Sequence, residues 1–279
     1  RITTQGTDLP PPLRYWNELS KYHIPPSLLQ GLVKVGYKDP TPIQRMAMPV
    51  SLCNRDVLAR AETGSGKTCS FLIPVLSFLN KKPRVTEKTA ENGPYALILA
   101  PVRELVMQIY TEAMKFSEFF PPQQRIKIAC IIGGGNIAQQ TSVLQSGVDM
   151  IIATPGRFMD VLQQHIIVLK QCSYLILDEA DRMLDEGFEV QVKQILSHMP
   201  SQETTLRPHE KFHDKNNINS PSNDIFNIDN ASNQASLAYR DQRRLTMLYS
   251  ATFTPKVIQL AHEYIQPNAV TIETGDTKH

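Results

Sequence analysis

A short apolar run that ends abruptly in acids constrains the fold of this chain more than any other feature. The run is Leu175-Ile176-Leu177, and Asp178-Glu179-Ala180-Asp181 follows it directly. A continuous apolar run is typical of a parallel strand buried on both faces, and ligands gather beyond the carboxyl ends of such strands. Similar runs alternate with helical stretches along the chain. We therefore predict an α/β fold, with a parallel sheet of about seven strands and helices on both faces.

The same alternation divides the chain into segments. Residues 1–24 are polar and contain proline, so we expect an irregular N-terminal extension, followed by one domain over residues 25–279. Residues 201–240 are rich in asparagine and poor in large apolar groups, which predicts a largely mobile insertion. Strands are predicted near residues 57–61, 96–100, 127–132, 149–153, 174–178, 245–249 and 269–272. Helices are predicted near residues 26–35, 43–51, 67–79, 103–118, 136–145, 156–164, 182–198 and 255–264.

A glycine-containing loop follows the first of these strands. It reads Ala61-Glu62-Thr63-Gly64-Ser65-Gly66-Lys67-Thr68. Gly64 and Gly66 allow consecutive backbone N–H groups to point inward and form a nest for phosphate oxygens. Lys67 would reach the β- and γ-phosphates, and the Thr68 hydroxyl would bind Mg²⁺. Because Ala61 stands where the general pattern has glycine, an ordinary turn before a helix is the alternative.

The acids after residue 177 could bind Mg²⁺ and activate water, which a phosphate loop alone does not do. Asp178 would hold Mg²⁺, and Glu179 would orient or deprotonate the water that attacks a γ-phosphate. The alternative is that Asp178 and Asp181 only cap the helix that follows. Because both the loop and the acids are present, we predict a magnesium-nucleotide site with Lys67, Asp178 and Glu179 as its catalytic residues.

Together these residues resemble the DEAD-box RNA helicases, whose signature is Asp178-Glu179-Ala180-Asp181. The other motifs stand in the family's order: a Q motif at Gly36 to Gln44 with Trp16 upstream (residues 16–44), a Walker A motif at Ala61 to Thr68, Pro101 to Leu105, Gly133-Gly134, Thr154 to Arg157 and Ser250-Ala251-Thr252. The resemblance covers nearly the whole chain and implies the first RecA-like domain of an ATP-dependent RNA helicase. One departure is Val102, where the family usually has threonine.

The resemblance implies a role for each motif. Gln44 would read adenine, because an amide donates to N7 and accepts from N6, and Tyr37 would stack on the base. ATP or ADP and Mg²⁺ are the expected cofactors. RNA would bind through its backbone to Arg103, Gly133, Gly134, Thr154 and Arg157. Asp181, Ser250 and Thr252 would couple hydrolysis to domain movement.

Residues in and beside these motifs are most similar to the spliceosomal branch that acts at the 5′ splice site. They are Val35 to Lys38, Glu179 to Met183, and the insertion before Ser250. This likeness implies a role in pre-mRNA splicing, spliceosomal protein partners, a monomeric chain and a nuclear location, with the cytoplasm as a second possibility. Because the chain begins at Arg1 and ends soon after Thr252, we expect a fragment that lacks the second RecA-like domain and hydrolyses ATP very slowly alone.

The sequence gives less support to other functional classes. The chain has no N-K-x-D guanine motif, no apolar run of membrane-spanning length and no C-x-x-C pair. The formal net charge is only +2, so RNA binding would rest on a local patch. His209-Glu210-Lys211-Phe212-His213 matches a zinc motif, but a low-complexity segment lacks the rigid helix and third ligand that such a site needs. A nucleotide-dependent RNA clamp or scaffold, in which hydrolysis is incidental, remains the alternative to a remodelling enzyme.

Overall fold

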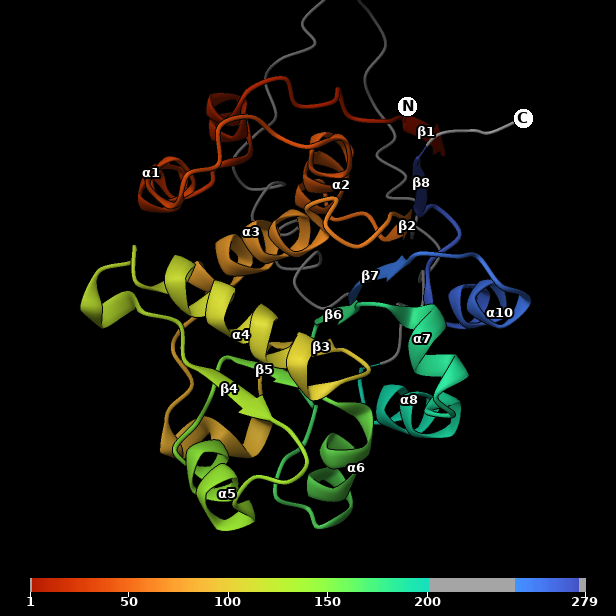
Figure 1. The fold of residues 1–279 in the computed structure, drawn as a ribbon. Helices are drawn as coiled ribbons and strands as arrows, with labels where there is room; N and C mark the ends of the chain where they lie inside the picture. Colours follow the sequence, from red (N-terminus) through yellow and green to blue (C-terminus); the bar gives the residue numbers. More distant parts are fainter. Residues whose placement is uncertain (1, 201–243, 276–279) are drawn as a thin grey trace, which may run out of the picture.

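A computed structural model describes residues 2–200 and 244–275, which form one sheet with helices on both faces (Figure 1). The sheet has eight strands in the order β1-β8-β2-β7-β6-β3-β5-β4. Every neighbouring pair is parallel except β1 and β8. The predicted insertion at 201–240 and the zinc motif at 209–213 lie outside the described residues. The predicted α/β class and parallel sheet are confirmed.

Each predicted strand is present. The strands are β1 (Ile2–Gln5), β2 (Val57–Arg60), β3 (Ala96–Leu99), β4 (Ile128–Ile131), β5 (Met150–Ala153), β6 (Tyr174–Leu177), β7 (Leu245–Ser250) and β8 (Val270–Thr274). All residues of β3, β5, β6 and β7 are buried. This burial on both faces is why these strands lack polar alternation and could be recognised as apolar runs.

The helices alternate with the strands along the chain. They are α1 (Pro26–Val35), α2 (Pro42–Leu52), α3 (Lys67–Asn80), α4 (Arg103–Ser117), α5 (Ile137–Gln145), α6 (Pro155–Gln163), α7 (Ala180–Asp185), α8 (Glu189–Ser197) and α10 (Pro255–Tyr264), with 3₁₀ turns η1 (Trp16–Tyr22), η2 (Glu87–Asn92) and η3 (Pro122–Gln124). The single helix predicted at 182–198 is wrong. Gly187 has a φ of 85° between α7 and α8, a conformation that favours glycine and ends the first helix.

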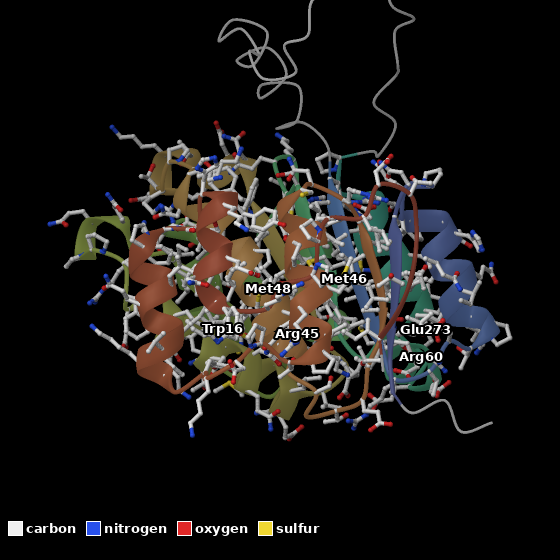
Figure 2. All side chains as sticks on the ribbon, turned by 90° about the horizontal axis from the view of Figure 1, so that it is seen from above. Trp16, Arg45, Met46, Met48, Arg60 and Glu273 are labelled. Atoms are coloured by element: carbon white, nitrogen blue, oxygen red, sulfur yellow. The ribbon has the colours of Figure 1, made fainter. Side chains whose placement is uncertain are left out.

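The N-terminal extension is less irregular than the sequence suggested. β1 adds to the sheet antiparallel to β8, with Ile2 opposite Thr274. The Arg55 guanidinium then binds the carbonyl oxygens of Thr7 and Asp8 on this segment. Further along this segment, the expected anchor Trp16, labelled in Figure 2, is buried. The extension is therefore fixed to the domain at both of its ends.

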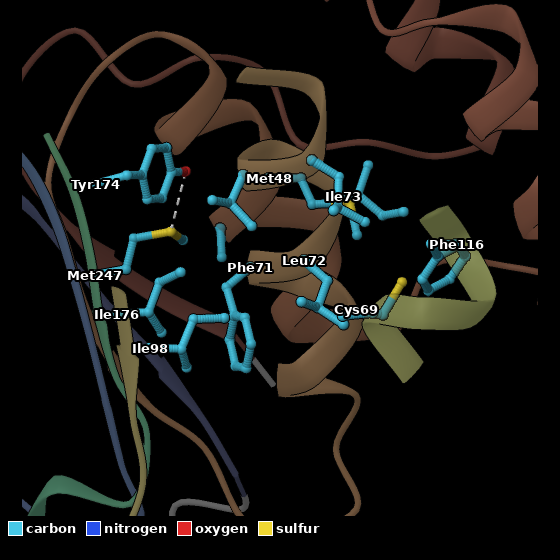
Figure 3. Close-up of a cluster of buried hydrophobic side chains, with 14 of the residues drawn as sticks. Met48, Cys69, Phe71, Leu72, Ile73, Ile98, Phe116, Tyr174, Ile176 and Met247 are labelled. Carbon is cyan, nitrogen blue, oxygen red and sulfur yellow. Dashed lines mark hydrogen bonds between the residues drawn. The ribbon is translucent and has the colours of Figure 1, made fainter. Parts of the chain in front are cut away.

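Two apolar layers hold the helices on the sheet. Side chains of α1 to α4 pack on one face, where Phe71, Ile98 and Ile176 meet (Figure 3). Side chains of α5, α6, α7, α8 and α10 pack on the other. On the first face the Tyr174 hydroxyl donates to the Met247 sulfur at 3.5 Å, a contact drawn in Figure 3. Because both layers are continuous, they fix the ends of the strands, where the predicted site residues lie.

Candidate active site

The phosphate loop connects β2 to α3. Gly64 and Gly66 have φ values of 81° and 93°, which glycine adopts without strain. A Cβ atom at Gly66 would lie 2.5 Å from the Gln44 amide nitrogen, so this glycine also permits a close approach. Gly66 is the residue immediately before α3, whose first turn holds Lys67 and Thr68. The loop therefore delivers both residues to the positive end of a helix.

Gln44 lies directly against this loop. Its side chain is fully buried, and its amide nitrogen donates to the Gly66 carbonyl oxygen at 3.0 Å. Its amide oxygen accepts from the Thr41 backbone N–H at 2.8 Å, as part of a capping box at the start of α2. The nitrogen keeps a second proton and the oxygen a second lone pair. Adenine recognition by Gln44 stays a prediction, and it would use these remaining groups.

Tyr37 packs between the extension and α4. Its hydroxyl donates to the Glu112 carboxylate at 2.9 Å, and its ring lies 6.3 Å from Trp16 in an edge-on arrangement and 6.1 Å from Phe116. Burial, the nearby Cys69 thiol and the Glu112 bond raise the pKa of Tyr37 far above its usual range. These contacts give Tyr37 a structural role, and its stacking on a base stays a prediction.

Lys67 and Asp178, two residues of the predicted nucleotide site, are both buried. The Lys67 ammonium donates to the Ala61 carbonyl oxygen at 3.1 Å. The Asp178 carboxylate accepts from the Glu179 N–H at 3.0 Å. Burial raises the pKa of Asp178 to about 6, although the Lys67 charge opposes the rise. A buried carboxylate and the half-buried Thr68 hydroxyl form a hard-oxygen donor set that fits Mg²⁺.

Glu179 has an uncommon backbone conformation. Its φ and ψ are both 51°, in the left-handed region that residues other than glycine seldom occupy. Such conformations cost about 1–3 kcal/mol and concentrate at functional sites. An ion pair of 3.6 Å joins the Glu179 carboxylate to the Arg182 guanidinium. The turn from β6 into α7 is therefore strained at the residue that we expect to activate water.

The acidic turn is bonded to the end of β7. The Asp181 carboxylate accepts from both the backbone N–H and the hydroxyl of Thr252, each at 2.8 Å. The Ser250 hydroxyl accepts from the Asp181 backbone N–H at 3.3 Å and donates to the Thr252 carbonyl oxygen at 2.7 Å. Burial disfavours the charge on Asp181, but these hydrogen bonds outweigh it and lower the pKa of the carboxyl. The Ala61 N–H also donates to the Ser250 carbonyl oxygen at 3.0 Å. β7 therefore touches both halves of the nucleotide site.

A second site lies at the same edge of the sheet, beyond β3, β4 and β5. A groove of about 410 Å³ is lined by Pro101, Val102, Arg103, Glu104, Gly133, Thr154, Gly156, Arg157, Asp160 and Phe188. Gly134 lies next to this groove, against the Arg103 guanidinium. The residues predicted to face RNA therefore meet in one place. Arg103 is exposed, so its charge is available to a ligand.

Two side chains hydrogen-bond to the backbone of the glycine turn at the groove. Only 12% of the Arg157 side chain is exposed, and its guanidinium donates to the Gly135 carbonyl oxygen at 3.2 Å. The Gln140 amide donates to the Ile132 carbonyl oxygen at 3.0 Å. These two side chains fix the turn that contains Gly133 and Gly134. The sequence did not single out Gln140, because one glutamine in a polar helix carries no motif.

Comparison with known proteins shows the family of the chain. The profile of the DEAD/DEAH box helicases matches residues 41–260. The chain belongs to this family. It is 42% identical to the pre-mRNA-splicing ATP-dependent RNA helicase PRP28 of Yarrowia lipolytica over 97% of its length, and 41% identical to the human probable ATP-dependent RNA helicase DDX23 over 96%. It spans 43% of the first protein and 30% of the second.

Solved structures give the same assignment. The crystal structure of the RNA helicase Prp28 from Chaetomium thermophilum bound to ADP matches with a TM-score of 0.74 and 35% identity. The yeast splicing factor Prp28 matches with a TM-score of 0.79 and 35% identity. Each match covers 99% of this chain and 54% of the other. The fold and the resemblance to the spliceosomal branch of the DEAD-box family are thus confirmed.

Within residues 2–200 and 244–275, no cluster of three or more histidine, cysteine or acidic side chains is placed to hold a metal ion. None of the helices described has the length and apolar character needed to cross a membrane.

Val102 departs from the family pattern at a position where a hydroxyl would have a local partner. It is the residue before α4 and has extended backbone geometry, but it offers no oxygen to the first turn of the helix. We expect Val102→Thr to raise the free energy of unfolding by about 1 kcal/mol, because an N-cap hydroxyl satisfies a free N–H group. Urea denaturation of Val102→Thr, compared with that of Val102→Ala, tests this expectation. Equal stability of the two variants would contradict the expectation.

Proposed function

We propose that this chain is the ATP-binding unit of an ATP-dependent RNA helicase. It would couple the binding and hydrolysis of Mg-ATP to RNA binding and to remodelling of RNA duplexes or RNA–protein complexes during pre-mRNA splicing in the nucleus. The printed names of its relatives support the reaction and the process, since they are called pre-mRNA-splicing ATP-dependent RNA helicases. ADP in the related Chaetomium structure supports the nucleotide.

One observation carries this proposal: the Ser-Ala-Thr motif is hydrogen-bonded both to the phosphate loop and to the acidic turn, at one edge of the sheet. The Ala61 N–H reaches Ser250, and Thr252 reaches Asp181. A change at the phosphates can therefore be transmitted to β7 through direct contacts. A simple nucleotide-binding protein has no need of this third element.

The chemistry follows from the positions of the side chains. Lys67 would neutralise charge on the β- and γ-phosphates, while Glu179 would take a proton from the attacking water. Thr68 and Asp178 would hold Mg²⁺, whose role in such sites is to neutralise charge on the phosphate oxygens. Gln44 would select adenine from its place against the loop. The nest formed by residues 61–66 would bind phosphate through backbone N–H groups.

RNA would bind in the groove beside Arg103. Its contacts would come from the Arg103 guanidinium, the Thr154 hydroxyl and the backbone N–H groups of Gly133 and Gly134, with Arg157 shaping the turn. Groups of this kind contact phosphate and sugar, so they position a strand without reading its sequence. We further propose that the chain acts as a monomer beside a second RecA-like domain and with spliceosomal proteins, and that residues 25–279 form one domain preceded by the extension at 1–24.

Calorimetric titration with ADP and then GDP, both with Mg²⁺, tests the nucleotide assignment. We expect saturable binding of ADP and none of GDP. Lys67→Ala should weaken ADP binding about 10- to 100-fold, because hydrogen bonds to charged groups contribute about 1.5–3 kcal/mol. Gln44→Ala should also weaken it and reduce the preference over GDP. Equal binding of ADP and GDP, unaffected by Gln44→Ala, would overturn the adenine site.

A further inference from the structure

We propose that Tyr249 and Ser70 form a buried positioning pair that holds the first turn of α3 in the geometry required for phosphate binding. The proposal rests on the nucleotide site proposed above and extends it. Tyr249 is the residue before the Ser-Ala-Thr motif, on β7. Ser70 lies one turn after Lys67, on α3. Neither residue belongs to a motif that we identified in the sequence.

The contacts form a chain from the sheet to the backbone of the phosphate-binding lysine. The Ser70 hydroxyl lies 2.6 Å from the Lys67 carbonyl oxygen and 2.9 Å from the Tyr249 hydroxyl. A carbonyl oxygen can only accept, and a serine hydroxyl has one proton. Ser70 therefore donates to Lys67 and accepts from Tyr249. The Tyr249 hydroxyl is thus the outermost donor of a directed chain of two hydrogen bonds that ends at Lys67.

The surroundings allow no alternative partner from solvent. Both side chains are fully buried, and the Tyr249 ring lies 5.3 Å from the Phe71 ring. Burial raises the pKa of Tyr249 well above its usual range, and the Asp178 charge adds to the rise. The hydroxyl consequently keeps its proton at physiological pH and remains a donor. A buried hydroxyl without a partner is costly, so the hydrogen-bonded pair is strongly favoured over separated groups.

The place of the pair suggests that it does more than stabilise the core. Its bonds fix the turn that carries Lys67 and Thr68, and the next residue on β7 accepts from the Ala61 N–H. The start of the phosphate loop and the first turn of α3 are therefore both tied to adjacent residues of one strand. A site held in its binding geometry loses less free energy on ordering when the ligand arrives. Removal of the pair should therefore weaken phosphate binding.

The test compares nucleotides that differ in one phosphate. In the full chain, Tyr249→Phe, Ser70→Ala and the double variant are titrated with Mg-ADP and with AMP by competition against a fluorescent ADP analogue. Urea denaturation gives the stability of each. We expect each single variant to bind ADP about three- to tenfold more weakly, as befits one net hydrogen bond, and AMP within about twofold of the original chain.

The double variant separates positioning from simple stability. Replacing both polar partners by apolar groups is often nearly neutral, so it should recover most of the stability lost by Ser70→Ala. Its ADP affinity should remain as weak as that of the single variants. If ADP affinity recovers together with stability, or if no variant affects ADP more than AMP, the pair is merely structural and the proposal is overturned.

Tyr174→Phe serves as the matched control. Tyr174 is a buried tyrosine on the neighbouring strand β6, and its hydroxyl bonds to Met247 rather than to α3. This variant should lose some stability but keep its affinity for ADP. Failure of the original chain to bind ADP would refute the proposed nucleotide site itself. Normal ADP binding by the original chain with unchanged affinity in Tyr249→Phe would refute the positioning pair alone.

Discussion

Replacing Glu179 by glutamine should slow RNA-stimulated ATP hydrolysis by about 10²–10⁴-fold, the usual contribution of a general base. Glutamine has nearly the same shape but cannot accept the proton of the attacking water. ADP affinity should therefore stay within about twofold of the original, since the phosphate contacts of Lys67 and the loop are unchanged. Steady-state hydrolysis measured with the second RecA-like domain present tests this expectation.

The matched control for this variant is Glu186→Gln. Glu186 is also an acid near α7, and it pairs with Arg182 at 2.8 Å. It lies on the surface, so its replacement should leave hydrolysis almost unchanged. If Glu179→Gln hydrolyses ATP at the normal rate, Glu179 is not the base. The variant also separates two functions in cells: a pure RNA clamp would keep its role when hydrolysis is blocked, whereas a remodelling enzyme would stall on its substrate.

Most of the proposed nucleotide site could be anticipated from the sequence, because its residues stand in short, local patterns. A glycine loop after an apolar run can be recognised without the fold, and so can acids at the end of another run. Parallel strands then bring both patterns to one edge, and the contact of Thr252 with Asp181 follows from that arrangement. Arg157 was harder to interpret, because its limited exposure and its bond to Gly135 depend on how the groove is packed.

Features that depend on long-range packing were missed for a physical reason. β1 is a strand because β8 offers it an open edge, although the β-branched residues Ile2, Thr3 and Thr4 are a usable signal. The break between α7 and α8 had a signal in Gly187, a helix-ending residue within an apolar periodic stretch. No sequence signal pointed to Tyr249 and Ser70. A tyrosine in a strand and a serine in a helix are common, and these two form a hydrogen bond only because β7 and α3 pack together.

Asp149 is a similar case, and its removal should have the largest effect on stability. This fully buried carboxylate stands just before β5. It accepts from the Val85 N–H and the Lys127 N–H, each at 2.8 Å, and from the Arg84 guanidinium at 3.1 Å. Asp149→Ala would remove the acceptor of the Val85 and Lys127 N–H groups and the ion-pair partner of Arg84, whose side chain is only 17% exposed. We expect the free energy of unfolding to fall by about 3–5 kcal/mol, a large part of the total of about 5–15 kcal/mol for a domain.

Urea denaturation of Asp149→Ala beside Asp185→Ala provides the measurement. Asp185 is exposed on α7, so its replacement should change stability by less than about 0.5 kcal/mol. Asp149→Asn keeps one acceptor oxygen but loses the charge, and its stability should lie between those of the original chain and Asp149→Ala. Equal stability of Asp149→Ala and Asp185→Ala would contradict the argument. Asp149 fixes the starts of β4 and β5, and the far ends of these strands carry the glycine turn and Thr154. Its loss should therefore also disorder the groove beside Arg103 before it affects the phosphate loop.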